Sequence, residues 1–396
     1  MIYPLKFLPL YKQVIWGGNR LKDYGFNYDP LPNCGELWAL SSVEGHESVI
    51  ANGFLAENTL NEAIEIYMGD LVGDRVFNRY GTEFPLLVKL IDAARDLSIQ
   101  VHPDDELAQR RGMPQGKTEM WYVMQADPGS QLISGFRRDT TPEEYTAALN
   151  SGHLTDLLHA EEPEPGDVYF IPAGRVHALG KGLMVAEIQQ TSDCTYRIYD
   201  YDRLDKDGKK RQLHTAEAMD AIDFSGISSS AGGPAHAHTH YHAHLNETTT
   251  IAACPYFITR LIPFDTPMRK NLEDVDTFVL YLCVDGLAAV KSMETIVPLH
   301  VGECCLVPAV ADSVELFCEG EAKLLEVTID TTDWTDAPNE DNDWVAQFIG
   351  GLRAANDATS DIGGLREAHD HDCDCGCDHD HHDHDCDCGH DHCDCQ

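Results

Sequence analysis

Residues 166–177 read Gly-Asp-Val-Tyr-Phe-Ile-Pro-Ala-Gly-Arg-Val-His. Val168 and Phe170 favour a half-buried strand, and Pro172 with Gly174 predicts a tight corner after it. His177 then points inward from the next strand. A histidine just past such a corner, at the mouth of a β-barrel, is well placed to hold a metal ion. The stretch therefore favours a β-barrel with a metal site, provided that other ligands converge on His177.

One upstream segment offers two such ligands. Residues 98–103, Ser-Ile-Gln-Val-His-Pro, alternate between polar and apolar types. In a strand, Ser98, Gln100 and His102 would share one face, because successive side chains point to opposite sides. A lone histidine on a strand is more often an ordinary core or surface residue, so His102 gains meaning only together with His177.

A second segment, residues 117–123, reads Lys-Thr-Glu-Met-Trp-Tyr-Val and is also strand-like. Lys117 and Glu119 would share a face there. A carboxylate in an apolar strand needs a partner, because burying it unpaired is costly. Glu119 is therefore a further candidate ligand.

Together these segments offer two imidazoles, one carboxylate and one amide oxygen to a common interior. Such a mixed nitrogen and oxygen set suits Zn²⁺, with Fe²⁺ or Mn²⁺ as competitors. A coordination position left open for substrate would make the site catalytic rather than structural.

The pattern of residues 166–177 resembles the second signature motif of the cupin superfamily. Further pieces, in order over about the first 330 residues, resemble type I mannose-6-phosphate isomerase, also called phosphomannose isomerase. These pieces are Trp-Gly-Gly at 16–18, Gly-Glu-Leu-Trp at 35–38, Gln-Val-His-Pro at 100–103, Lys-Thr-Glu-Met-Trp-Tyr at 117–122, the run at 172–177 and Gln-Thr-Ser-Asp-Cys-Thr-Tyr-Arg-Ile-Tyr-Asp-Tyr-Asp-Arg at 190–203.

From the strand and turn pattern, the internal repeat and the composition described below, we expect a mainly β fold with two cupin-like jelly-roll domains, small helical insertions and a disordered C-terminal tail. The resemblance implies a role for each of nine residues. Zn²⁺ would be held by Gln100, His102, Glu119 and His177; Arg197 would be an active-site residue; Lys117 and Asp193 would lie near the reacting carbons; Ser98 and Lys89 would lie near the phosphate.

The implied reaction is the reversible isomerisation of D-mannose 6-phosphate and D-fructose 6-phosphate through a cis-enediol, with Zn²⁺ as Lewis acid. Either Lys117 or Asp193 would move the proton between C1 and C2, and the sequence does not rank them. Each has an ordinary alternative role, since Lys117 can pair with a carboxylate and Asp193 can cap a turn.

The formal net charge of −39 limits the possible partners. Residues 369–396 carry ten of these negative charges, and 29 remain on the rest of the chain. So acidic a chain disfavours nucleic acid and anionic membrane surfaces as partners, because both need a basic face. The expected partner is a small-molecule sugar phosphate, which needs a local cationic pocket; Arg203 is a reserve candidate there. We expect a cytoplasmic protein, because the N-terminal residues lack the apolar core and cleavage site of a signal peptide.

Changes in composition divide the chain into five expected parts. They are a metal-binding catalytic cupin domain at 1–227, a linker with a His-rich run at 228–246, a second, metal-free jelly-roll at 247–330, an extension with a short helix at 331–368 and a disordered tail at 369–396. The second jelly-roll is inferred because Gly-x5-Pro-Ala at 302–309 repeats 166–173 without the following Gly and His. Helices are expected at 60–68, 104–111, 141–150 and 215–222.

The tail contains only Asp, His, Cys, Gly and Gln, including eight His and seven Cys. Without apolar side chains it cannot build a core, and its thiols and imidazoles suit additional divalent or soft metal ions. The alternative is an acidic, solubilising tail. For the whole chain, two other functions stay open: a different metal-dependent cupin enzyme such as an Fe²⁺ dioxygenase, and a non-catalytic metal-handling or sugar-binding protein.

Overall fold

The computed structural model describes residues 2–204, 207–227, 238–241, 243–332 and 334. They lie in a compact unit that spans Met1–Asn342. The helix expected within 331–368 and the tail at 369–396 lie outside the described residues. No helix in the described part of the chain is long and apolar enough to cross a membrane.

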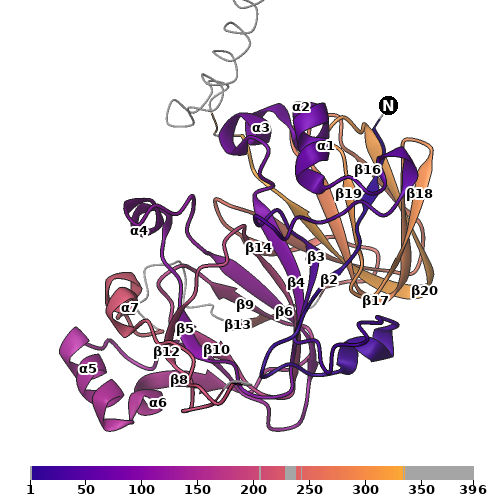
Figure 1. The fold of residues 1–396 in the computed structure, drawn as a ribbon. Helices are drawn as coiled ribbons and strands as arrows, with labels where there is room; N and C mark the ends of the chain where they lie inside the picture. The colour runs from indigo at the N-terminus through magenta and orange to yellow at the C-terminus, as the bar shows by residue number, and fades with distance from the viewer. Residues whose placement is uncertain (1, 205–206, 228–237, 242, 333, 335–396) are drawn as a thin grey trace, which may run out of the picture. The chain divides into compact units, whose positions relative to one another are not determined.

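The described residues form three antiparallel sheets (Figure 1). The first, the seven-stranded sheet, contains the strand that follows Gly166. Its order is β13 (His238–His240), β9 (Asp167–Ile171), β6 (Glu119–Ala126), β11 (Leu183–Gln190), β4 (Leu86–Ala93), β3 (Glu36–Leu40) and β2 (Leu10–Lys12).

The five-stranded sheet faces the seven-stranded sheet. Its order is β12 (Tyr196–Tyr199), β5 (Ile99–Val101), β10 (His177–Leu179), β7 (Leu132–Phe136) and β8 (Leu158–Glu161). Trp121 and Val185 of one sheet pack in the same apolar cluster as Leu132 and Leu179 of the other. The interior between these two sheets is where the candidate ligands meet.

Both faces of the central strands β4 and β11 of the seven-stranded sheet are buried, and strand alternation decides which face each side chain occupies. On β4, Val88 and Leu90 pack on the outer side, whereas Ile91 belongs to the cluster between the sheets. On β6, Met120 points outward and Trp121 inward. Charged side chains on the inner positions of these strands therefore face the site.

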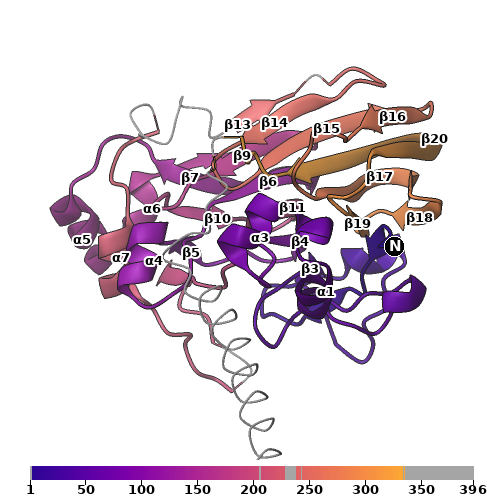
Figure 2. The ribbon, with the colours of Figure 1, turned by 90° about the horizontal axis from the view of Figure 1, so that it is seen from above.

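The eight-stranded sheet has the main order β1 (Leu5–Lys6), β19 (Cys304–Val307), β17 (Val279–Ser292), β20 (Ser313–Thr328), β15 (Ile258–Phe264) and β14 (Thr249–Ala253), while β16 (Met268–Asn271) pairs with β20 and β18 (Thr295–His300) pairs with β17. All strands of this sheet except β1 come after the other two sheets in the sequence, and Figure 2 shows β15, β16, β17 and β20 together. The sheet encloses an apolar core of its own, which includes Tyr281 and Leu324.

Short helices cover the outer faces of the sheets. α1 (Leu60–Tyr67), α2 (Gly69–Val72) and α3 (Asp74–Tyr80) pack in the core that links the seven- and eight-stranded sheets, and α4 (Asp105–Arg110), α5 (Pro142–Ser151), α6 (Leu154–Leu157) and α7 (Thr215–Ala221) pack on the five-stranded sheet. Figure 1 shows α5, α6 and α7 beside β5, β8 and β12. Thr59 and Thr141 each form a capping box, which explains why α1 and α5 begin where they do.

The prediction of a mainly β fold is confirmed. Several boundaries differ. The strand expected at 98–103 covers only Ile99–Val101, and the strand expected at 117–123 begins at Glu119 and runs to Ala126, so Lys117 precedes it. The expected linker contributes β13, which pairs with β9. The pairing of Leu5 with Leu306 joins the expected first and second domains in one sheet, and the division at 227 stays a prediction.

Candidate active site

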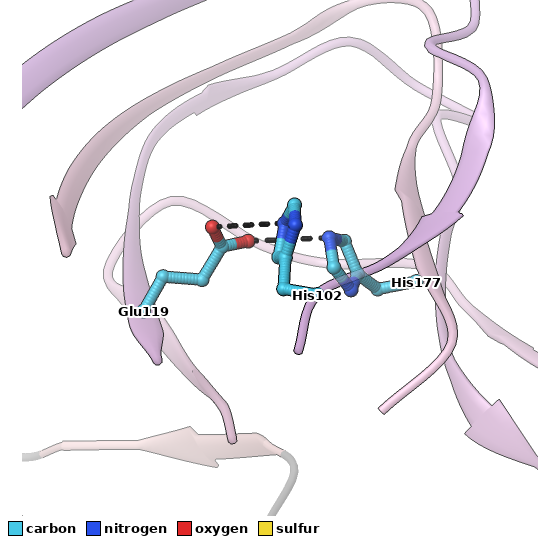
Figure 3. Close-up of side chains that lie close together, drawn as sticks. All are labelled: His102, Glu119 and His177. Atoms are coloured by element: carbon cyan, nitrogen blue, oxygen red, sulfur yellow. Dashed lines mark ion pairs between the residues drawn. The ribbon is translucent and has the colours of Figure 1, made fainter. Parts of the chain in front are cut away.

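Two histidines and a glutamate meet between the five- and seven-stranded sheets (Figure 3). Nε2 of His102 lies 3.4 Å from Oε2 of Glu119, and Nε2 of His177 lies 3.3 Å from Oε1 of the same carboxylate. Glu119 opens β6, His177 opens β10 and His102 follows β5. All three side chains are at least 99% buried.

Backbone carbonyls fix how the two imidazoles point. Nδ1 of His102 donates to the carbonyl of Cys194 at 2.9 Å, and Nδ1 of His177 donates to the carbonyl of Arg175 at 2.8 Å. Each ring then presents the lone pair of Nε2 toward Glu119. A proton shared with a carbonyl on the far nitrogen is the usual way in which a metal-binding histidine is oriented.

The polar atoms of this cluster fit a cation. Nε2 of His102 and both carboxylate oxygens of Glu119 are buried and make no hydrogen bond to the described residues, although Oε2 has the ammonium of Lys117 as an ion-pair neighbour at 3.1 Å. Leaving such groups unsatisfied is costly, because each loses its hydration. A divalent cation between them would satisfy all three.

Burial also sets protonation states that suit metal binding. Burial, assisted by the positive charge of Lys117, lowers the pKa of His102 to about 3. Burial likewise lowers the pKa of His177. Burial alone would raise the pKa of Glu119, but Lys117 and the histidines hold it well below its ordinary range. Neutral imidazoles beside a carboxylate are the forms that bind metals.

Gln100 lies next to this cluster. It pairs with His177 across β5 and β10, and its amide nitrogen lies 3.2 Å from Nε2 of His177. The oxygen and nitrogen of a side-chain amide can exchange places by rotation. Gln100 is therefore within reach as a fourth ligand.

A cavity of about 330 Å³ adjoins the cluster. Six of the residues predicted from sequence line it: Lys89, Ser98, Gln100, Lys117, Asp193 and Arg197. They come from separate strands and loops, so only the fold brings them together.

Lys117 lies closest to the cluster, with its ammonium 3.1 Å from Oε2 of Glu119. This contact is the ordinary role that the sequence also allowed, and it places the amine at the cavity wall as well. Arg197 donates to the carbonyl of Gln212 at 2.9 Å, while its Nε is buried without a partner among the described residues. Burial and the neighbouring Arg211 lower the pKa of Arg197 from its usual value, but a guanidinium stays charged.

Lys89 is held by two carboxylates inside the protein. Its ammonium lies 3.2 Å from Oε1 of Glu187 and 3.8 Å from Oε2 of Glu36. Burial alone would lower its pKa, but Glu187 and Glu36 raise it above the ordinary value. Lys89 is thus a charged member of the cavity wall whose ammonium is paired with two carboxylates.

Sequence reasoning missed Glu187, Glu36 and Arg211, which line the same cavity. Glu187 had a usable signal. It lies in the apolar run Leu-Met-Val-Ala-Glu-Ile-Gln-Gln at 183–190, where a carboxylate needs a partner for the same reason as Glu119. Arg211 lies on an irregular segment whose sequence gives no periodic signal.

Sequence comparisons relate the chain to mannose-6-phosphate isomerases, which are also called phosphomannose isomerases. A family model described as phosphomannose isomerase type I, catalytic domain, matches residues 5–143. The chain is 37% identical over 309 residues to the mannose-6-phosphate isomerase ManA of Bacillus subtilis, a match that covers 77% of this chain and 93% of that protein. It is 38% identical over 259 residues to mannose-6-phosphate isomerase of Streptococcus mutans, covering 65% of this chain and 78% of that protein.

Solved structures agree with this placement. A crystal structure of mannose 6-phosphate isomerase from Bacillus subtilis matches with a TM-score of 0.68 at 30% identity, over 82% of this chain and 99% of that one. A mutant of phosphomannose isomerase from Salmonella typhimurium matches with a TM-score of 0.63 at 18% identity, over 83% of this chain and 100% of that one. The second match, at its low identity, bears on the fold alone.

Proposed function

Because this chain belongs to the type I phosphomannose isomerase family, we propose that it interconverts D-mannose 6-phosphate and D-fructose 6-phosphate. The observation that carries the proposal is the buried His102–Glu119–His177 cluster beside a cavity lined by Lys117, Asp193 and Arg197. The reaction moves a proton between C1 and C2 of the open-chain sugar through a cis-enediol. It needs a stabiliser for negative charge on oxygen and a group that moves the proton.

We assign Zn²⁺ to the cluster, held by His102, Glu119 and His177, with Gln100 as the fourth ligand. The mixed nitrogen and oxygen donors support this assignment, and Fe²⁺ or Mn²⁺ are the competing ions. When bound, such a cation supplies Lewis-acid stabilisation of negative charge on the substrate oxygens.

The chain's own residues supply the remaining chemistry. The half-buried guanidinium of Arg197 lines the cavity, and its Nε–H has no hydrogen-bond partner among the described residues, so that this positive charge suits a developing oxyanion. Lys117 and Asp193 are the two candidates for the proton transfer, since both line the cavity. A proton carrier must come within reach of the hydrogen that it moves. Lys117 or Asp193 would therefore act only on a substrate whose C1 and C2 lie beside it in the cavity.

The phosphate group of the substrate requires hydrogen-bond donors on another part of the cavity wall. We propose Ser98 and Lys89 for this role, and both line the cavity. Ser98 is buried and offers a hydroxyl, whereas Lys89 contributes through its charge while it stays paired with Glu187. Arg211, which lines the same cavity and pairs with Asp200, adds further positive charge there.

A coupled assay that follows fructose 6-phosphate formed from mannose 6-phosphate tests the function. Turnover should be lost on treatment with a chelator and return on addition of Zn²⁺. Turnover that survives complete removal of metal would contradict the metal assignment. The absence of turnover in the metal-replete protein would contradict the isomerase itself and favour a non-catalytic metal-handling or sugar-binding protein.

We also propose that residues 369–396 bind additional divalent or soft metal ions, because of their eight His and seven Cys. Deletion of 369–396 should lower the number of Zn²⁺ ions bound per chain by more than one and leave turnover nearly intact in metal-replete buffer. A large loss of kcat would show that the tail takes part in the reaction.

A further inference from the structure

The same arrangement of four strands occurs in two of the sheets. The order β9-β6-β11-β4 in the seven-stranded sheet has its counterpart in β19-β17-β20-β15 of the eight-stranded sheet. The sequence repeat anchors the correspondence, since the Gly-x5-Pro-Ala motif contains β9 at 166–173 and β19 at 302–309. Strand pairing then relates each position of one sheet to a position of the other.

In the seven-stranded sheet, one row of pairs across β6, β11 and β4 holds Trp121, Glu187 and Lys89. Nε1 of Trp121 donates to Oε2 of Glu187 at 2.8 Å. The ammonium of Lys89 lies 3.2 Å from Oε1 of Glu187. An aromatic donor, a carboxylate and a cation thus form a row in the wall of the candidate active site.

The corresponding row across β17, β20 and β15 holds Tyr281, Glu326 and Arg260. The hydroxyl of Tyr281 donates to Oε2 of Glu326 at 2.9 Å. A guanidinium nitrogen of Arg260 lies 3.4 Å from Oε1 of Glu326. The residue types change, but the aromatic donor, the carboxylate and the cation keep their positions, so the second row repeats the first.

The metal ligands are not repeated. Glu119 pairs with Ile171, and the position that pairs with the equivalent Val307 is Val279. The residue that follows the second motif at the distance of His177 is Ser313. The eight-stranded sheet therefore repeats the row of aromatic donor, carboxylate and cation without the candidate metal ligands. Nothing in this second row would support Lewis-acid chemistry.

The second row also lines a cavity, of about 380 Å³. Arg260, Lys270 and Glu326 lie at its inner wall, and the ammonium of Lys270 also contacts Glu326. Two cations around one buried carboxylate leave an excess of positive charge there. Thr277 lines the same cavity, and its hydroxyl is buried without a hydrogen-bond partner among the described residues.

The rim of this cavity is acidic. Asp274 and Asp330 line it with exposed carboxylates, and Asp276 lines it as well, although its carboxylate already accepts from the backbone N–H groups of Asp74 and Arg75. Carboxylates repel a bare anion but accept hydrogen bonds from hydroxyl groups. A ligand that places an anionic group on the cations and hydroxyls on the carboxylates and on Thr277 would match both parts of the cavity. A sugar phosphate has this distribution of groups.

We propose that the cavity of Arg260, Lys270 and Thr277 is a second, non-catalytic binding site for a sugar phosphate. The choice of a sugar phosphate rests on the proposed function, because the substrate and the product of that reaction are sugar phosphates that the protein would encounter. The phosphate lies against Arg260 and Lys270, and the sugar hydroxyls face Thr277 and the rim.

Isothermal titration with glucitol 6-phosphate, a reduced sugar phosphate that cannot isomerise, tests the site. The full chain should bind two equivalents. Lys270→Gln and Thr277→Val should each weaken one of them at least tenfold without changing kcat. Arg197→Gln should weaken the other equivalent and leave the second site intact. Titrations with inorganic phosphate and with glucitol should each give markedly weaker binding at the second site.

One equivalent per chain, removed by Arg197→Gln, would overturn the proposal. So would binding that is unchanged in both Lys270→Gln and Thr277→Val while thermal unfolding shows that the variants are folded. The isomerase assay separates this inference from the proposed function. Normal turnover with one equivalent contradicts the second site alone, whereas two equivalents without any turnover contradict the isomerase alone.

Discussion

Lys117 holds the carboxylate that faces both histidines, with 3.1 Å between its ammonium and Oε2 of Glu119. The two residues are only two positions apart, yet Glu119 begins β6 and Lys117 lies just before it. The backbone N–H of Lys117 donates to the carbonyl of Pro103, directly after His102. The amine is thereby fixed between the candidate metal centre and the cavity.

This position allows the two proton-transfer candidates to be separated. Removing the acid–base group of the residue that moves the proton should lower the kcat of the enzyme by about 10²–10⁴-fold. Lys117→Met and Asp193→Asn are the variants, and exchange of the C2 hydrogen of mannose 6-phosphate with solvent deuterium is the measurement. The variant that loses exchange identifies the base. Equal exchange in both variants and the wild type would remove both residues from this role.

His102→Ala should abolish turnover together with the metal bound in the core. The reason is that His102 and His177 are the two imidazoles that face Glu119. Metal content is best measured in chains that lack 369–396, so that the tail does not contribute. His300→Ala is the matched control, because this exposed histidine pairs with Glu303 far from the site and should change neither quantity. Full activity in purified His102→Ala would contradict the assignment.

Glu187→Gln should destabilise the protein, because it removes the nearer partner of a buried lysine. Breaking a buried ion pair by removing one partner costs about 3–5 kcal/mol. Chemical denaturation measures the loss of unfolding free energy. Glu319→Gln, at an exposed position, is the control and should change it by less than about 0.5 kcal/mol. An unchanged free energy in Glu187→Gln would mean that Glu36 alone satisfies Lys89.

Glu83 should give the protein a pH-dependent stability. Burial raises the pKa of this carboxyl from 4.5 to about 7. A raised carboxyl pKa means that the folded protein holds its proton more tightly than the unfolded chain, so stability falls as pH rises from about 4.5 to about 7.

The variant Glu83→Gln removes this titration. It should be more stable than the wild type by about 1–2 kcal/mol above about pH 7, a value reduced for solvent screening, and should match it below about pH 4.5. Thermal unfolding across the pH range measures the difference. A constant difference at all pH values would show that packing rather than charge explains the effect.

Much of the candidate site could be predicted from sequence because strand alternation is local. The inward direction of Glu119 follows from its place in an apolar strand, and that of His177 follows from the corner before it. α1 and α5 were predictable from their capping residues. By contrast, α2 and α3 carry no comparable start signal, since neither has a side-chain cap, and they were missed.

The pairing of residues far apart in sequence could not be predicted. Lys89 is expected near the phosphate, and only the pairing of β4 with β11 reveals Glu187, 98 positions later, as the direct partner of its ammonium. The strand β1 at the start of the chain pairs with β19 near the end of the described residues. Such pairs depend on which strands become neighbours, and the sequence of either strand alone does not specify this.

The sequence by itself determined the type of fold, the family and which residue types carry the chemistry, because periodicity and turn residues act within a few positions of the chain. Only the tertiary structure decided how closely His102, Glu119 and His177 approach one another and that Glu187 and Glu326 occupy repeated positions in two cavities. The physical reason is that hydrogen-bonded strand register and burial arise between distant segments, and these fix which charges must satisfy one another.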